Sequence, residues 1–156
     1  MSTLTFQVYG EPIPQGSTRA FIPKGWTRPI ITAANKKTKP WRQEIAGAAL
    51  AAMEKDLLDC AGKNVAFRLT VTFRFQKPKS VKKTVLEKVT KPDTDKLIRS
   101  VLDALTGIVW TDDSQVVEIL ARKQFGIQPG VDIIIEEIVG LPPARMLKPE
   151  WIEPPF

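Results

Sequence analysis

Four aspartates stand close together in residues 91–115 of this sequence. Asp93 and Asp95 come at the start of a predicted helix, and Asp112 and Asp113 follow its far end. Two like unit charges roughly 4 Å apart repel by about 4 kcal/mol at an effective dielectric constant of about 20. A divalent cation held by oxygen ligands best offsets such repulsion. Because the chain carries a formal net charge of +6, these residues predict a carboxylate metal site on a basic surface, which is typical of a nuclease.

The composition narrows the chemistry that the chain can perform. Its 156 residues contain no histidine, which excludes Ser-His-Asp and Cys-His nucleophilic catalysis and most zinc sites. An active site must therefore use carboxylates, lysine, arginine, hydroxyl groups and a metal ion. The positive net charge predicts a polyanionic partner. The single cysteine, Cys60, excludes an internal disulfide and fits a reducing cytoplasm.

The sequence predicts one domain over residues 1–156, a length that allows a buried core. The N-terminal residues alternate between apolar and polar types, as in a strand, and lack the charged-then-apolar order of a signal peptide. No apolar run approaches the roughly 20 residues that span a bilayer. We therefore expect a soluble protein without membrane contact in the bacterial cytoplasm, whether its gene is cellular or belongs to a phage or prophage.

The periodicity of apolar residues predicts an α/β domain with a mixed sheet of about four strands and two principal helices. The strands are expected at residues 4–9, 65–75, 114–125 and 131–139, with a further short strand at 29–32. The helices are expected from 39 toward 57 and from 93 to 106, where Gly107 ends the second helix. Residues 141–156 are expected to form an irregular, proline-rich tail.

Two segments of the sequence are strongly basic. Residues 12–43 contain seven Lys/Arg and no acid, and residues 76–91 contain six lysines and one acid, Glu87. Lysine runs are often only solvated surface, but beside a metal site they predict contacts with DNA phosphates. The residues expected to contact DNA are Arg19, Lys36, Lys37, Lys77, Lys79, Lys82, Lys83 and Lys96.

Each acidic pair also has an ordinary structural explanation. Pro92 disfavours helix before it, so Asp93 is well placed as an N-cap. Asp112 and Asp113 suit a turn before a strand. A helix of about 14 residues is about 21 Å long, so the two pairs meet only if the following strand starts near the helix N-terminus. Local spacing does not decide this.

The stretch KPDTDKLIRSVLDALTGIVWTDDSQVVEI resembles the signature of the RusA family of Holliday junction resolvases. In that pattern D-x-D-N opens a helix, a basic residue follows one turn later, and D-A-L and D-D-x-Q come after it. Asp93 and Asp95 match D-x-D, Asp103 opens D-A-L, and Asp112 and Asp113 open D-D-x-Q. The opening YGEPIPQGSTR, the basic loop and a Trp-containing helix extend the resemblance over most of residues 4–139.

The resemblance implies a RusA-like fold and a homodimer that resolves four-way and branched DNA by paired symmetric incisions, in recombination and repair. The implied cofactor is Mg²⁺, for which Mn²⁺ can substitute, with no small-molecule cofactor. The implied metal ligands are Asp93, Asp95 and Asp113. The catalytic lysine of the family falls on Arg99, which keeps the charge but does not donate a proton as lysine does, so we expect it to stabilise charge. The Asn of the family pattern falls on Lys96, which we expect to reach a phosphate.

Supporting roles are expected for the other two aspartates of the motif. Neighbouring side chains of a strand point to opposite faces, which predicts Asp113, rather than Asp112, as the ligand. Asp112 is then a turn residue or a hydrogen-bonding neighbour of the site. Asp103 lies on one helix line with Asp95 and Arg99, at the spacing of a surface ion-pair ladder.

Two other functions use the same residues differently. A non-catalytic protein that binds branched DNA would use the acids as caps and ion pairs, and its binding would not depend on Mg²⁺. A small-molecule phosphohydrolase would use the same metal site, but it needs no extended basic surface.

Overall fold

The structure, a computed structural model, describes residues 3–16, 18–33, 35–56 and 58–139. Its elements in chain order are β1 (Thr3–Tyr9), β2 (Thr18–Phe21), β3 (Ile30–Ala33), α1 (Thr38–Lys55), β4 (Ala66–Gln76), α2 (Thr94–Leu105), the short 3₁₀ helix η1 (Asp113–Gln115), β5 (Val116–Gly126) and β6 (Gly130–Ile138). Four strands form one mixed sheet in the order β1-β6-β4-β5, and β2 and β3 form a separate two-stranded sheet. The predicted α/β fold is confirmed. The predicted tail lies outside the described residues.

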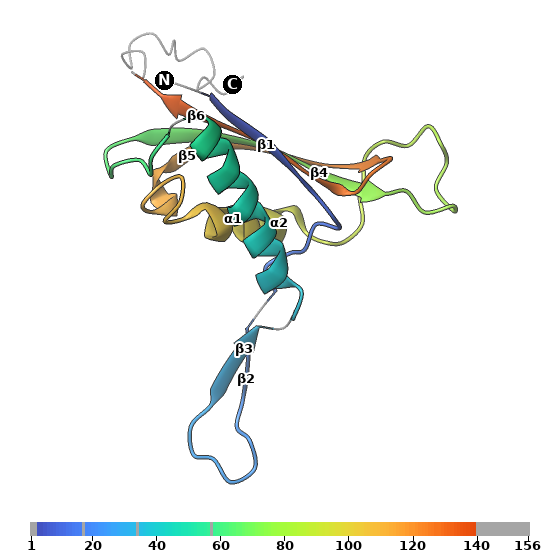
Figure 1. The fold of residues 1–156 in the computed structure, drawn as a ribbon. Helices are drawn as coiled ribbons and strands as arrows, with labels where there is room; N and C mark the ends of the chain where they lie inside the picture. The colour runs from blue at the N-terminus through green and yellow to red at the C-terminus, as the bar shows by residue number, and fades with distance from the viewer. Residues whose placement is uncertain (1–2, 17, 34, 57, 140–156) are drawn as a thin grey trace, which may run out of the picture.

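The pairing of the strands sets the direction of α2. β6 is antiparallel to both β1 and β4, whereas β5 is parallel to β4. Parallel neighbours need a crossover connection, and α2 lies within that crossover, packed with α1 on one face of the sheet (Figure 1). The first turn of α2 therefore lies toward the ends of β4 and β5, and its last turn lies toward their starts.

The core forms between the two helices and this face of the sheet. Every second residue of β4 from Phe67 to Phe75 is buried, as the period of two predicts. α2 contributes Leu97, Val101 and Leu105, each fully buried. Gly107, with φ +81°, follows α2 and lets the chain turn back.

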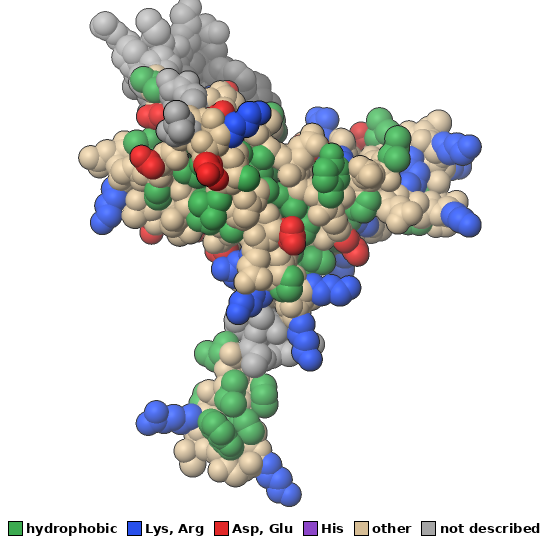
Figure 2. All heavy atoms as spheres, viewed as in Figure 1, with side chains coloured by type: hydrophobic (Ala, Val, Ile, Leu, Met, Phe, Trp, Pro, Cys, Tyr) green, Lys and Arg blue, Asp and Glu red, His purple; other side chains and the backbone are tan. Residues whose placement is uncertain are grey.

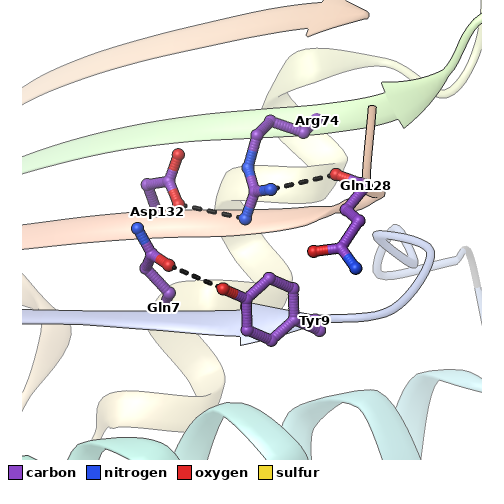
Figure 3. Close-up of polar contacts among 5 residues, drawn as sticks. All are labelled: Gln7, Tyr9, Arg74, Gln128 and Asp132. Carbon is purple, nitrogen blue, oxygen red and sulfur yellow. Dashed lines mark hydrogen bonds and ion pairs between the residues drawn. The ribbon is translucent and has the colours of Figure 1, made fainter. Parts of the chain in front are cut away.

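The opposite face of the sheet carries polar side chains and charged pairs, with Leu120 and Ile134 exposed among them. Arg74 on β4 donates to Asp132 on β6 at 3.1 Å and to the carbonyl oxygen of Gln128 at 2.9 Å. Its guanidinium also lies 5.6 Å from the ring centre of Tyr9 on β1, whose hydroxyl donates to Gln7 (Figure 3). One arginine thus links three strands.

The bounds of the predicted elements agree with the structure to within two residues, and one short strand was not predicted. β2 was not predicted, because residues 11–38 are rich in proline, glycine and basic side chains and lack a long apolar alternation. β5 begins at Val116 rather than at residue 114, because residues 113–115 form η1. The first helix starts at Thr38 and ends at Lys55. None of the helices in the described parts of the chain is long and apolar enough to cross a membrane.

We expect Gly130→Ala to destabilise the fold. A Cβ on Gly130 would press against the carbonyl oxygen of Val8 and lie 2.8 Å from Nη2 of Arg74, so the three-strand link of Arg74 would have to move. Overpacking of this kind costs about 1–3 kcal/mol in the free energy of unfolding, measurable by urea denaturation. Gly47→Ala is the control, because a Cβ there meets nothing within 4 Å and alanine favours helix. Equal stability of both variants would contradict the packing assigned to Gly130.

Candidate functional site

The first acidic pair lies at the N-terminus of α2. Asp93 occupies the N-cap position with extended backbone, as predicted, but its side chain makes no capping hydrogen bond. It pairs instead with Lys96 at 3.3 Å. Asp95 is exposed in the first turn, where the positive end of the helix dipole favours an anion. Two carboxylates, separated by one residue, thus stand at a helix end that attracts negative charge.

A lysine that the sequence did not single out holds this helix start in place. Nζ of Lys123 on β5 donates to the carbonyl oxygens of Thr90 at 2.8 Å and Pro92 at 2.7 Å. Both carbonyls belong to the three residues before Asp93. The sequence alone does not show this role of Lys123, because the role depends on the strand register that places the end of β5 beside α2.

A cleft of about 440 Å³ opens beside Asp93. Lys37 and Lys96 line it together with Asn35, and Lys91 adds a further positive charge at its wall. The backbone N–H of Gln15 donates to the carbonyl oxygen of Lys96 at 2.9 Å, which ties the segment after β1 to α2. Glu11 also lines the cleft and was not predicted as a site residue. The cleft therefore contains both carboxylates, which suit a metal cation, and lysines, which suit a phosphate.

The second acidic pair lies at the other end of α2, in η1. The Asp112 side chain accepts a hydrogen bond from the backbone N–H of Ser114 at 2.8 Å and caps the 3₁₀ turn. Hydrogen bonds from the side chain and backbone of Ser114 lower the pKa of the Asp112 carboxyl. Gln115 is buried and completes the capping box, and its amide also donates to the carbonyl oxygens of Gly62 at 2.8 Å and Val65 at 3.0 Å. The turn is therefore fixed to the chain before β4.

Asp112 and Asp113 are both exposed, but only Asp112 is engaged in a cap. The Asp113 side chain makes no hydrogen bond or ion pair with any described residue. The strand-alternation reasoning that separated the two aspartates does not apply, because both precede the first residue of β5. The distinction between them rests instead on the cap, which occupies the Asp112 carboxylate and leaves Asp113 free.

One chain does not bring the two acidic pairs together. β5 starts near the C-terminal end of α2. Asp113, which comes just before β5, therefore lies away from Asp93 and Asp95. The twelve residues of α2 alone separate its ends by about 18 Å. Within residues 3–139, apart from the three not described, no three acidic or other metal-binding side chains gather in one group.

The remaining helix residues take different partners from those expected. Asp103 lies 4.0 Å from Arg42 of α1, so it links the two helices rather than extending a line with Asp95. Arg99 is exposed and pairs with no acid in the described chain. It remains available to an external anion one turn beyond Asp95.

The predicted DNA-contacting residues lie in three places. Arg19 belongs to β2, and Lys36 and Lys37 follow β3 next to the cleft. Lys96 lies in the cleft itself. In the loop after β4, Nζ of Lys77 donates to the carbonyl oxygens of residues 82 and 83, at 3.3 and 2.8 Å, and so folds the loop. The other loop lysines of the prediction are exposed: Lys79, Lys82 and Lys83.

The sequence matches a known family model and individual relatives. The family model of the endodeoxyribonuclease RusA matches residues 10–136, which contain both acidic pairs, the cleft and the basic loop. The Bacillus subtilis (strain 168) protein YqaN is 30% identical over 146 residues, covering 88% of this chain and 99% of YqaN. A crossover junction endodeoxyribonuclease rusA of Lactococcus phage r1t is 35% identical over 81 residues, covering 51% of this chain and 61% of the phage protein. The chain belongs to the RusA endodeoxyribonuclease family.

Proposed function

We propose that this protein is a Mg²⁺-dependent endonuclease that resolves Holliday junctions and related branched DNA, in recombination and repair, by paired symmetric incisions. The observation that carries the proposal is the pair of exposed acidic groups, one at each end of α2, on a chain of the RusA family. The net charge of +6 and the three lysines of the cleft beside Asp93 favour a DNA backbone over a small substrate. The name of the phage relative gives the same substrate class for that protein.

The proposed metal site contains Asp93 and Asp95 of one chain and Asp113 of a second chain. The first two supply oxygen donors suited to Mg²⁺, but among the described residues of one chain no third acid joins them in a group that could hold a metal ion. Mg²⁺ held by these carboxylates would supply an activated water and charge stabilisation for the phosphate. Arg99 neutralises the scissile phosphate without donating a proton, and Lys96 contacts a neighbouring phosphate.

The outer edge of β5 supports a homodimer of this kind. β5 ends the sheet order, and its first half exposes Val117, Ile119 and Leu120. Near its end, the backbone of Lys123 and Phe125 already bonds to the loop residues 86–88. A long apolar edge strand favours pairing with another strand. Antiparallel pairing of the free first halves of two β5 strands about a two-fold axis directs the start of one strand toward the end of the other. The start follows Asp113, and the end carries Lys123, which holds the backbone before Asp93.

Two incisions in a junction of near two-fold symmetry require two equivalent sites, which such a dimer provides.

The separation of the acids within one chain also favours an alternative function, that of a non-catalytic protein that binds branched DNA. The two functions differ in one assay. Incubation of a labelled four-way junction with the protein cuts the DNA only in Mg²⁺ if the protein is a resolvase, and leaves it intact with and without Mg²⁺ if it only binds.

We expect Asp93→Asn, Asp95→Asn and Asp113→Asn each to lower junction cleavage at least about 100-fold while junction binding persists, because each removes a charged ligand and no basic residue. Asp112→Asn is the matched control: asparagine caps a helix as well as aspartate does, so its rate should stay within about threefold of the wild-type rate. Cleavage rates are measured at saturating Mg²⁺, and thermal denaturation checks that each variant is as stable as the wild-type protein. Equal losses at Asp112 and Asp113 would remove Asp113 from the site.

A mixing experiment tests whether each site spans two chains. Asp93→Asn and Asp113→Asn proteins are unfolded, mixed and refolded, or co-expressed. In a mixed dimer one site carries both substitutions and the other carries neither. The mixture should therefore regain about a quarter of the wild-type site concentration and should nick the junction on one strand.

The control mixture combines Asp93→Asn with Asp95→Asn. Both substitutions lie at the same end of α2, so every site of a mixed dimer keeps one of them, and no activity should return. If neither mixture regains activity although mixed dimers form, the composite site is wrong.

The basic loop generates a prediction about salt dependence. Replacing Lys79, Lys82 and Lys83 with Gln should weaken junction binding and reduce the slope of log Kd against log salt by about 0.9 for each phosphate that the loop no longer neutralises. Lys55→Gln, at the far end of α1, should leave the slope unchanged. Titrations at four salt concentrations measure both. An unaltered slope in the triple variant would make this loop a solvated surface.

A further inference from the structure

The β2–β3 hairpin is an arm that projects from the body of the protein (Figure 1). Its two strands pair over residues 18–21 and 30–33, and these strands pack mainly against each other rather than against any other element. A two-stranded hairpin is marginally stable alone in water. The arm therefore gains little from the core of the protein, and its apolar residues need another explanation.

Large apolar side chains gather on this arm and face solvent (Figure 2). Trp26 is 61% exposed, Phe21 50% and Ile31 68%. Ala20 pairs with Ile31 and Phe21 pairs with Ile30, so both faces of the hairpin carry apolar groups. An exposed apolar group of this size on a monomer indicates a binding surface.

The tip of the arm is built to present the tryptophan. The backbone N–H of Trp26 donates to the carbonyl oxygen of Pro23 at 3.0 Å, and Gly25 between them has φ +88°. A turn of this form requires a residue that tolerates positive φ at its third position. The indole therefore follows a defined turn rather than an irregular loop.

Charge identifies the partner of this apolar surface. Lys24 and Arg28 flank Trp26, and residues 18–33 contain no acid. A second copy of the arm would bring like charges together, whereas nucleic acid offers phosphates for the cations and flat bases for the rings. The base of the arm also leads to the cleft, because Asn35 and Lys37 line it together with Asp93.

We propose that Trp26 stacks on an unstacked base at the branch point of a DNA junction, while Lys24 and Arg28 bind the adjoining phosphates. Bases in a continuous duplex are covered by their neighbours, whereas a branch point interrupts that stacking. The contact thus distinguishes branched DNA from duplex without reading sequence. This inference rests on the proposed junction-resolving function, which it deepens by naming a residue that selects the branch.

Binding is measured in EDTA with a four-way junction and with a duplex of the same arm sequence. Trp26→Ala should raise Kd for the junction by about 5- to 150-fold, the range for removal of one base–aromatic stack, and should leave Kd for the duplex unchanged. Trp26→Phe should restore most of the junction affinity, because a ring remains. Ile127→Ala, at a fully exposed apolar residue in the turn between β5 and β6, is the control and should change neither Kd.

A second measurement locates the contact directly. Junctions carrying 5-iodouracil at the branch point, or in the middle of one arm, are irradiated with the wild-type protein. The cross-linked peptide should contain Trp26 only for the branch-point label.

The outcomes separate this inference from the proposed function. If the wild-type protein cuts junctions but Trp26→Ala binds them as tightly as the wild type does, the stacking role is wrong and the function stands. If the wild-type protein neither prefers nor cuts junctions, the function itself fails and the inference fails with it. A change of oligomeric state in Trp26→Ala, measured by sedimentation, would assign the arm to a second copy of the chain and overturn the proposal.

Discussion

The parallel pairing of β4 with β5 governs where every candidate ligand of this chain lies. Strands that run in the same direction cannot be joined by a tight turn, so the chain between them crosses the sheet through α2. A helix in such a crossover has one end near the ends of the two strands and its other end near their starts. The aspartates at the start of α2 and those after its end are consequently held apart by the same pairing that buries Leu97, Val101 and Leu105 in the core.

Each acidic pair is then fixed by a side chain from another part of the fold. Gln115 joins η1 to the carbonyl oxygens before β4, and Lys123 joins the end of β5 to the carbonyl oxygens before α2. Buried or partly buried hydrogen bonds of this type are costly to break without replacement. Neither residue need touch a substrate, yet each holds the backbone next to an acidic pair.

The sequence predicted the elements with strong periodicity and the residues with a specific motif. β4 and α2 were found because their apolar positions repeat at two and at three to four residues, and the family was found from the D-x-D, D-A-L and D-D-x-Q strings. β2 was missed because it lies in a segment rich in proline, glycine and basic side chains, without a long apolar alternation. Lys123 was missed because its partners lie more than thirty residues away in sequence. The separation of the aspartates depends on the direction of β5, which no local pattern encodes.

β5 reaches both acidic pairs, since it begins after the turn of Asp113 and carries Lys123 near its end. A strand bonded along a neighbour keeps a nearly constant length of about 3.3 Å per residue. The strand therefore acts as a mechanical spacer, and the twist of the sheet fixes the relative orientation of the two carboxylate groups. Fraying at one end of β5 loosens one group, whereas fraying of β1, at the opposite border of the sheet, leaves the spacing between the groups intact.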